Sequence, residues 1–202
     1  MATQTIYIQL LTEQLDSALN EIFKSGKPVG YVPLSNKQFY SFMYIGLKKH
    51  QLSDPRPSVG VSDFGTNVGP GDTIQWQILT FPEPPIFPPV PPPIIQNLSI
   101  DLISIYDAAN APIIFPLPIT PLPGSANQIW TGTVSGLYQN NELFPHSLSY
   151  KIQFSFVYDG NYYYFQFDPL IEPKPKSWLC DQYIFVIKFS KRRKKEWNND
   201  ET

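Results

Sequence analysis

The alternation of apolar and polar residues is clearest across Ser147–Pro169. Apolar side chains occupy every second position from Tyr150 to Phe156, which is the period of a strand with one buried face. Asp159-Gly160-Asn161 is typical of a tight reversal, and Tyr162–Phe167 returns before the chain reaches Asp168-Pro169. The stretch therefore predicts a β-hairpin whose second strand ends at this Asp-Pro pair.

Six other segments are predicted strands, because they alternate or are rich in aromatic and β-branched residues. In Asp72–Ile78, Ile74, Trp76 and Ile78 share one face and polar residues the other, the pattern of a half-buried strand. The six segments are Thr5–Leu10, Gln38–Leu47, Asp72–Ile78, Leu98–Tyr106, Ile129–Val134 and Trp178–Phe189.

A helical period appears once, across Thr12–Lys24. Its apolar residues Leu15, Leu19, Ile22 and Phe23 lie at i, i+4, i+7 and i+8, with Thr12 as expected N-cap and Gly26 as the stop. Surface helices normally bury such a stripe against the core, so we expect this helix to pack on the sheet as a lid rather than to bind a partner.

Proline changes the expected connections. The chain has 22 prolines, against about 10 at ordinary usage. They concentrate in two predicted loops, segments 81–93 and 112–124. In segment 81–93, proline removes ladder donors and excludes a central strand. We expect stiff surface connections, with a polyproline ligand for an SH3-like groove as the alternative for 81–93. Ser53–Gly71 is predicted to be turn, and Glu172–Lys176 a further linker.

About eight strands, one helix and no βαβ alternation predict an all-β fold, a jelly-roll or Greek-key β-sandwich formed by residues 1–202 as one domain. A lone cysteine, Cys180, excludes an intramolecular disulfide. The chain begins without a signal-peptide pattern and contains no apolar run of membrane-spanning length, so we expect a cytoplasmic protein without a membrane partner.

Charge is uneven along the chain. Residues 1–187 carry 9 basic and 14 acidic side chains, and residues 188–202 carry 6 basic and 3 acidic ones. The run Lys191–Lys195 is short and followed by acidic residues, so the tail 190–202 is interpreted as solubilising rather than as a nucleic-acid contact.

Residues able to carry catalysis or hold a cofactor are scarce. Two histidines, His50 and His146, and one cysteine cannot build a four-ligand zinc site from His and Cys alone. Phosphate-loop, nucleophile-elbow and zinc-protease motifs are missing, so no enzyme and no cofactor are expected. A hydrolase using either histidine is kept as an alternative.

Two groups of residues are candidate ligand or interface sites. Asp63 and Asp72 bracket a loop with oxygen ligands suited to Ca²⁺, although Asp, Asn and Gly are also ordinary turn residues and no metal is expected. Tyr162, Tyr163 and Tyr164 could stack on sugar rings, but alternation turns Tyr163 away from the other two. Core packing or a subunit contact is the preferred interpretation of the tyrosines.

Three segments in order resemble one known family. Gly71-Asp72-Thr73-Ile74-Gln75-Trp76, Trp130-Thr131-Gly132 and the Tyr150 strand with Phe167-Asp168-Pro169 are similar to the AidA/PixA family of bacterial inclusion body proteins. The resemblance covers roughly residues 60–172 and implies a jelly-roll-like sandwich, a cytoplasmic location and no catalytic residues. The helix, segment 81–93, the C-terminal strand and the low methionine content depart from it.

Physically, the matched residues Trp76, Trp130, Asp168 and Pro169 are interpreted as structural anchors. The functional expectation is a non-catalytic, self-associating β-sandwich that forms homo-oligomers. The alternative is a lectin-like carbohydrate-binding module.

Overall fold

The structure is a computed structural model that describes most of the first 173 residues. The described residues are 2–24, 26, 29–49, 65–69, 71–81, 95–105, 115, 117–134, 138–139, 142–143 and 148–173. The predicted strand Trp178–Phe189, the basic tail, most of segment 81–93, and His50, Asp63, His146 and Cys180 lie outside these residues.

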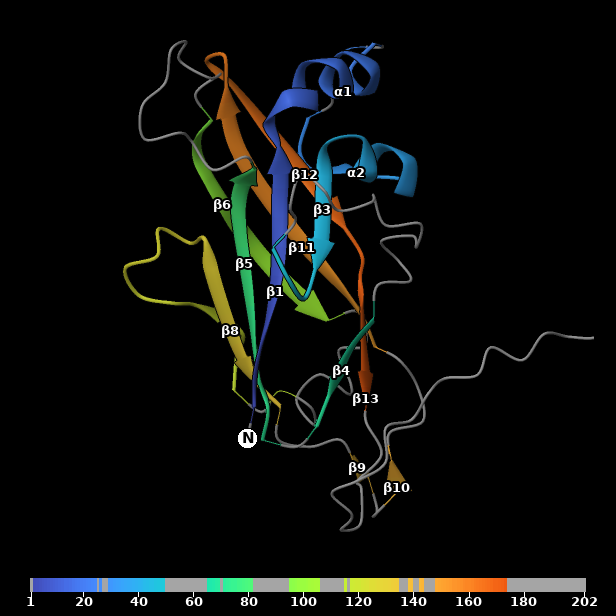
Figure 1. Ribbon diagram of the computed structural model, residues 1–202, viewed down its shortest axis with the longest axis vertical. Coiled ribbons are helices and arrows are strands. Elements are labelled where there is room, and N and C mark those ends of the chain that lie inside the picture. The colour runs from blue at the N-terminus through green and yellow to red at the C-terminus, as the bar shows by residue number, and fades with distance from the viewer. Residues whose placement is uncertain are drawn as a thin grey trace, which may run out of the picture.

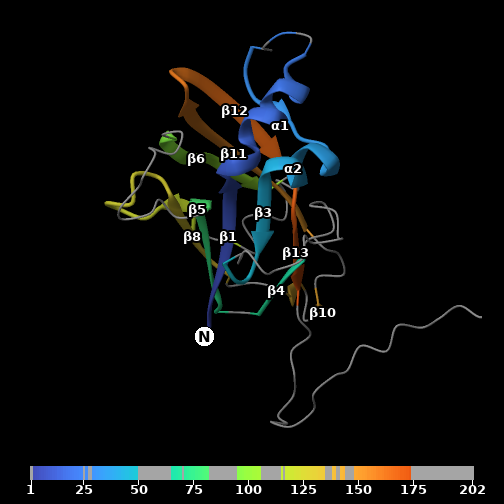
Figure 2. The same ribbon diagram turned by 45° about the horizontal axis from the view of Figure 1, so that its top comes forward.

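Two β-sheets face each other in this part of the chain, with their apolar sides in one shared core (Figures 1 and 2). The first sheet has the order β3-β1-β5-β8-β7. It consists of β3 Met43–Gly46, β1 Thr3–Leu11, β5 Thr73–Phe81, β8 Ile129–Thr133 and β7 Thr120–Pro121. The predicted all-β, sandwich-like fold is confirmed.

The second sheet has the order β2-β12-β11-β13-β4, with β6 on the other edge of β11. It consists of β2 Val32–Pro33, β12 Asn161–Phe167, β11 Leu148–Tyr158, β13 Leu170–Pro173, β4 Gly65–Val68 and β6 Gln96–Ile105. A short separate pair joins β9 Tyr138–Gln139 and β10 Glu142–Leu143.

Alternation places the apolar residues of the first sheet in the core. In β5, Ile74, Trp76 and Ile78 are buried, as predicted, and the residues between them are partly exposed. β5 runs parallel to β1, with Ile6 beside Trp76, and antiparallel to β8, with Trp130 on its other side.

The predicted hairpin is β11 and β12. Asp159 (φ 48°) and Gly160 (φ 68°) form a two-residue turn, and the positive φ at both positions is that of a type I′ turn, which suits the strand twist. The inward residues of β11 are buried from Tyr150 to Phe156, and Phe165 and Phe167 meet them from β12. The hairpin prediction is confirmed.

The break at Asp168-Pro169 ends β12 but not the pairing with β11. The N–H of Tyr150 donates to the carbonyl of Pro169 at 3.1 Å, and the chain then continues beside β11 as β13. β13 pairs in parallel with β4, which lies inside the stretch predicted to be only turn. That prediction was wrong at Gly65–Val68, because a four-residue strand in a Gly- and Asn-containing segment depends on its partner rather than on local propensity.

β6 confirms the predicted strand but not its simple alternation. Leu98 and Ile100 are buried, whereas Leu102 is 43% exposed and Ile103 is buried. The register with β11 shifts at this point, because Gln153 pairs with Leu102 and Phe154 with Ile100. Asp101 is therefore the extra residue of a β-bulge, which reverses the phase of the strand.

The predicted first helix begins as a 3-10 turn, η1 Thr12–Gln14, and continues as α1 Leu15–Ile22. Its stripe packs on the core as a lid, with Leu15 and Leu19 buried. Thr12 is not the N-cap, since its hydroxyl donates to the carbonyl of Phe81 at 3.3 Å, at the end of β5. Gly26 follows the helix with φ 104° and donates to the Phe23 carbonyl, in agreement with the predicted stop.

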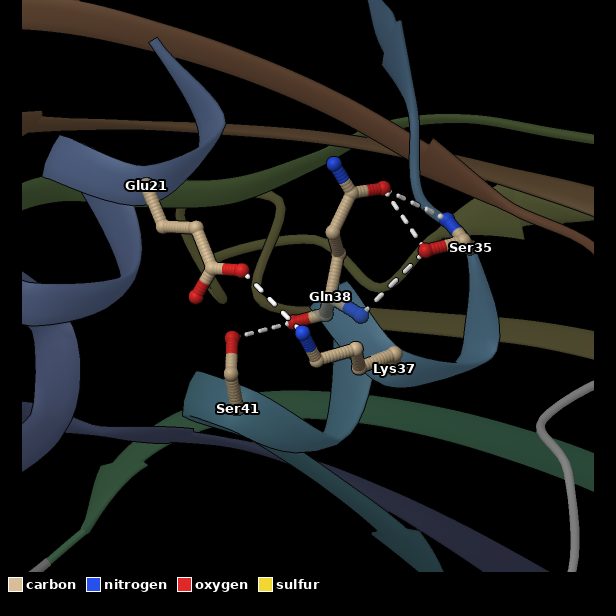
Figure 3. Close-up of polar contacts among 5 residues, drawn as sticks. All are labelled: Glu21, Ser35, Lys37, Gln38 and Ser41. Carbon is tan, nitrogen blue, oxygen red and sulfur yellow. Dashed lines mark hydrogen bonds and ion pairs between the residues drawn. The ribbon is translucent and has the colours of Figure 1, made fainter. Parts of the chain in front are cut away.

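The predicted strand Gln38–Leu47 is wrong over its first part, which is the helix α2 Asn36–Phe42. Ser35 and Gln38 form a capping box in which the Gln38 N–H donates to Ser35 Oγ and the Ser35 N–H to Gln38 Oε1 (Figure 3). Local capping thus overrides the strand preference of the aromatic residues, and the strand begins only at Met43. Both helices lie at the same end of the molecule (Figures 1 and 2).

Lys37 of α2 also forms an exposed 3.2 Å ion pair with Glu21 of α1 (Figure 3). Exposed pairs of this kind contribute little to stability. Neither described helix is long and apolar enough to cross a membrane.

Candidate functional site

The three consecutive tyrosines of β12 divide between the two sides of the sheet, as alternation requires. Tyr162 and Tyr164 point away from the core and are 62% and 39% exposed. Their rings are nearly parallel, with centroids 6.4 Å apart and an interplanar angle of 13°. Tyr163 points inward, where its ring packs on Phe23 and Phe156. Two of the three predicted tyrosines are therefore placed together on the outer face.

A polar cluster lies beside these rings on the same face. The Asp101 carboxylate accepts hydrogen bonds from the hydroxyls of Ser99 and Ser155 at Oδ1, both at 3.0 Å. Its Oδ2 accepts from the Tyr31 hydroxyl at 3.0 Å. The ring of Tyr31 meets that of Tyr164 edge-on at 5.6 Å. We call Tyr31, Ser99, Asp101, Ser155, Tyr162 and Tyr164 the tyrosine–aspartate face.

Strand register explains why these residues meet. Tyr164 of β12 is paired with Ser155 of β11, and Ser155 with Ser99 of β6, so the three form one row across the sheet. The next row contains Gln166 and Gln153, whose side chains are joined by a 3.1 Å hydrogen bond. The bulge at Asp101 inserts the carboxylate between the two rows, and bulges commonly redirect a side chain in this way.

The electrostatics of the cluster favour a protonated Tyr31. Burial and the hydrogen bond to Asp101 raise the pKa of Tyr31 to about 12. A phenolate beside a carboxylate would be repelled, so Tyr31 stays a hydrogen-bond donor at neutral pH. Two serine hydroxyls and one phenol thus surround a single carboxylate.

The edge of β12 is a second feature of the site. β2 pairs with Phe165 and Gln166, and the Leu34 N–H donates to the Gln166 carbonyl at 2.9 Å. Because peptide groups alternate along a strand, the N–H and C=O of Tyr164 and Tyr162 point to the same side as those of Gln166, away from β11. Within the described residues, no strand pairs with Asn161–Tyr164 on that side.

A hollow of about 260 Å³ lies at this edge. It is formed by the end of α1, the segment before β2 and the tyrosines of β12. The lining residues are Phe23, Val29, Gly30, Val32, Tyr162, Tyr163 and Tyr164.

Asp72, the described member of the calcium pair, is placed in a turn. Its Oδ1 accepts from the Ala2 N–H at 3.0 Å and its Oδ2 from the Gly69 N–H at 2.9 Å, so both oxygens stabilise the backbone around β1 and β5. Asp63 lies outside the described residues. In the described ranges, no group of three or more His, Cys, Asp or Glu side chains could hold a metal ion.

The residues interpreted as anchors occupy structural positions. Trp76 is fully buried, and its Nε1–H donates to the Tyr150 hydroxyl at 3.1 Å. Trp130 is buried, with its Nε1–H donating to the Ile100 carbonyl at 3.0 Å. Pro169, directly before β13, is buried, whereas Asp168 is exposed.

Gly132, two residues after Trp130, allows close packing. A Cβ at this position would lie 3.0 Å from Ile119 and 3.2 Å from Phe115. The Trp-x-Gly segment thus combines a large buried ring with the space for its neighbours.

Sequence reasoning missed Tyr31, Ser99, Asp101 and Ser155. One signal was present: the adjacent apolar residues Leu102 and Ile103 break the alternation that begins at Leu98. Such a break indicates a bulge, but only the register with β11 shows that the extra residue is the acid.

Comparison with known proteins adds no family. No protein-family model matches the chain, and a search of curated proteins finds no significant match. The chemistry of the site is aromatic stacking, hydrogen bonding and a strand edge that pairs with no strand among the described residues. His50 and His146, on which a hydrolase would depend, lie outside the described residues.

Proposed function

We propose that the protein is a non-catalytic β-sandwich that associates with copies of itself, as its resemblance to the inclusion body family implies. The observation that carries the proposal is the edge of β12 at Tyr162 and Tyr164, which pairs with no strand among the described residues. Unpaired N–H and C=O groups on a strand edge are a template for pairing with another chain.

The composition of this edge supports the proposal. Natural proteins usually protect such edges with charged side chains, proline or a bulge. Asn161–Phe167 contains no charged residue and no proline. A second copy approaching in the antiparallel direction would therefore meet tyrosines rather than a repelling charge.

The hollow beside the edge points to the same kind of partner. Pockets for small molecules usually measure about 300–1,000 Å³. The observed 260 Å³ lies below that range and is bounded largely by aromatic and aliphatic side chains. It suits side chains of an added strand better than an organic ligand.

Sedimentation velocity over a range from micromolar to near-millimolar protein tests self-association. We expect the sedimentation coefficient to rise with concentration in the parent protein. Tyr162→Lys should keep the protein monomeric, because it places a charge on the pairing edge while leaving the ladder with β11 intact. Electron microscopy and fractionation of expressing cells would test for assemblies and for the cytoplasmic location that the family resemblance implies.

Thr133→Lys is the matched control. Thr133 is an exposed strand residue of the first sheet, on β8, so the same charge there should leave association unchanged. A parent protein that stays monomeric at every concentration would refute the proposal. Equal effects of both lysine substitutions would show that net charge, not the β12 edge, controls association.

A further inference from the structure

We infer that the tyrosine–aspartate face is a binding site for a neutral saccharide. This site is distinct from the strand edge, since it uses side chains on the outer face of the sheet rather than the backbone of β12. It combines exposed parallel rings with a cluster of hydroxyl, amide and carboxylate groups in adjacent rows.

The aromatic part matches the apolar surface of a sugar. Tyr162 and Tyr164 lie two residues apart on one strand, and their rings are exposed and within 13° of parallel. Aromatic faces pack on apolar surface, and each tyrosine also supplies a hydroxyl. The edge-on ring of Tyr31 adds a third aromatic wall beside Tyr164.

The polar part matches the hydroxyls of a sugar. A carboxylate has about four lone-pair sites, and Asp101 uses three of them for Ser99, Ser155 and Tyr31. One site remains for a ligand hydroxyl, and each serine oxygen keeps acceptor capacity. In the next row, the Gln153 and Gln166 amides use one carbonyl and one NH₂ group on each other, which leaves a carbonyl and an NH₂ group for a ligand.

Charge selects a neutral ligand over an anionic one. Asp101 is the acidic side chain of the two central rows and disfavours phosphate or carboxylate groups. Lys151 lies on the same face of β11, two residues from Gln153 and four from Ser155, which places it about 7 Å and about 13 Å along the strand from those residues. A neutral hydroxylated ligand can donate to Asp101 without bringing a charge.

Asp101 also positions part of the site. Its Oδ2 holds the Tyr31 hydroxyl and so fixes the ring against Tyr164. An asparagine at this position would offer an amide donor or a weaker acceptor to Tyr31. The carboxylate therefore contributes both its own acceptor site and the location of the third ring.

Binding is tested with a panel of neutral oligosaccharides: cellohexaose, xylohexaose, maltohexaose, mannohexaose and chitohexaose. Oligogalacturonate serves as the acidic counterpart. Microarray binding is followed by isothermal titration of each oligosaccharide that binds. We expect at least one neutral oligosaccharide to bind and oligogalacturonate not to bind.

Tyr164→Ala and Asp101→Asn should each weaken that binding by about tenfold or more, which corresponds to losing roughly 1.4 kcal/mol of contact energy. Tyr7→Ala is the matched control, because Tyr7 is a partly exposed tyrosine of β1 in the other sheet. It should leave the affinity unchanged. Circular dichroism would show that each variant is folded, and Asp101→Asn tests the site if Tyr164→Ala does not fold.

Three results would overturn the inference: no binding of any panel member, binding that both site variants leave unchanged, or preference for oligogalacturonate. Sedimentation of Asp101→Asn separates this inference from self-association, because Asp101 lies on β6 and not at the β12 edge. Lost saccharide binding with unchanged sedimentation would assign the two properties to different sites.

Discussion

The hydrogen bond between Trp76 and Tyr150 joins the two sheets inside the core. Trp76 belongs to β5 and Tyr150 to β11, both side chains are 0% exposed, and Nε1 lies 3.1 Å from the hydroxyl oxygen. Their rings also meet at 5.8 Å and 64°. Burial raises the pKa of Tyr150, so the phenol stays neutral and able to accept this bond.

The losses of unfolding free energy caused by the two single substitutions should add up to more than the loss caused by the double substitution. Trp76→Phe leaves the Tyr150 hydroxyl without its donor, and Tyr150→Phe leaves the indole N–H without its acceptor. A buried polar group left unsatisfied costs about 1–3 kcal/mol. The double variant has neither orphaned group, so its loss should fall short of the sum of the single losses by about 1–2 kcal/mol.

Urea unfolding followed by far-UV circular dichroism measures this coupling, since fluorescence would lose one of its reporters. Trp130→Phe provides the matched control, because its Nε1–H donates to the Ile100 carbonyl and not to Tyr150. Combined with Tyr150→Phe it should be additive. Additivity of Trp76→Phe and Tyr150→Phe within about 0.5 kcal/mol would refute the interaction. Trp76→Ala should cost about 3–5 kcal/mol, a large part of the ~5–15 kcal/mol that stabilises a typical domain.

Two further predictions concern α1 and α2. Burial and the 2.6 Å hydrogen bond to Asp16 raise the pKa of Tyr158 to about 12 from 10.0, so the folded state holds this proton more tightly than the unfolded state. The stabilisation from this raised pKa is complete below pH 10 and disappears as the pH rises to about 12. Tyr158→Phe should therefore flatten the decrease in unfolding free energy between pH 10 and about pH 12. An unchanged dependence of unfolding free energy on pH would contradict the role given to Tyr158. Ser35→Ala should cost about 1 kcal/mol in urea unfolding by removing the cap of α2, whereas Ser41→Ala, which removes one hydroxyl donor on the same helix, should cost less.

The elements that sequence alone predicted are those whose pattern is local. The hairpin was predictable because alternation, Asp-Gly turn chemistry and the Asp-Pro break all lie within one stretch. α2 was predictable in principle from Ser35 and Gln38, but the aromatic content of the segment outweighed a three-residue capping signal. β4 and β2 carry no strong pattern, because strands of two to four residues exist through their partners in the sheet.

The candidate site was predictable only in its tyrosines. Because side chains of a strand alternate between the two faces of the sheet, the sequence alone shows that Tyr162 and Tyr164 share a face and that Tyr163 lies on the other. The partners of these rings come from positions 31, 99, 101 and 155, which only cross-strand register and the bulge bring together. A lone aspartate in an alternating strand looks like an ordinary solvent-facing residue until its three hydroxyl donors are known.

The two proposed properties use the same strand without competing for it. A second copy that pairs with the edge of β12 adds in the plane of the sheet, whereas a saccharide stacks above that plane on the outward rings. Pairing would place two tyrosine–aspartate faces on one continuous sheet surface. A linked pair of weak sites binds a long chain with higher avidity than either site alone, provided that the chain spans both. Tyr162→Lys removes one of the two parallel rings as well as the pairing, so it should weaken binding to a short soluble glycan and weaken binding to a long immobilised one further.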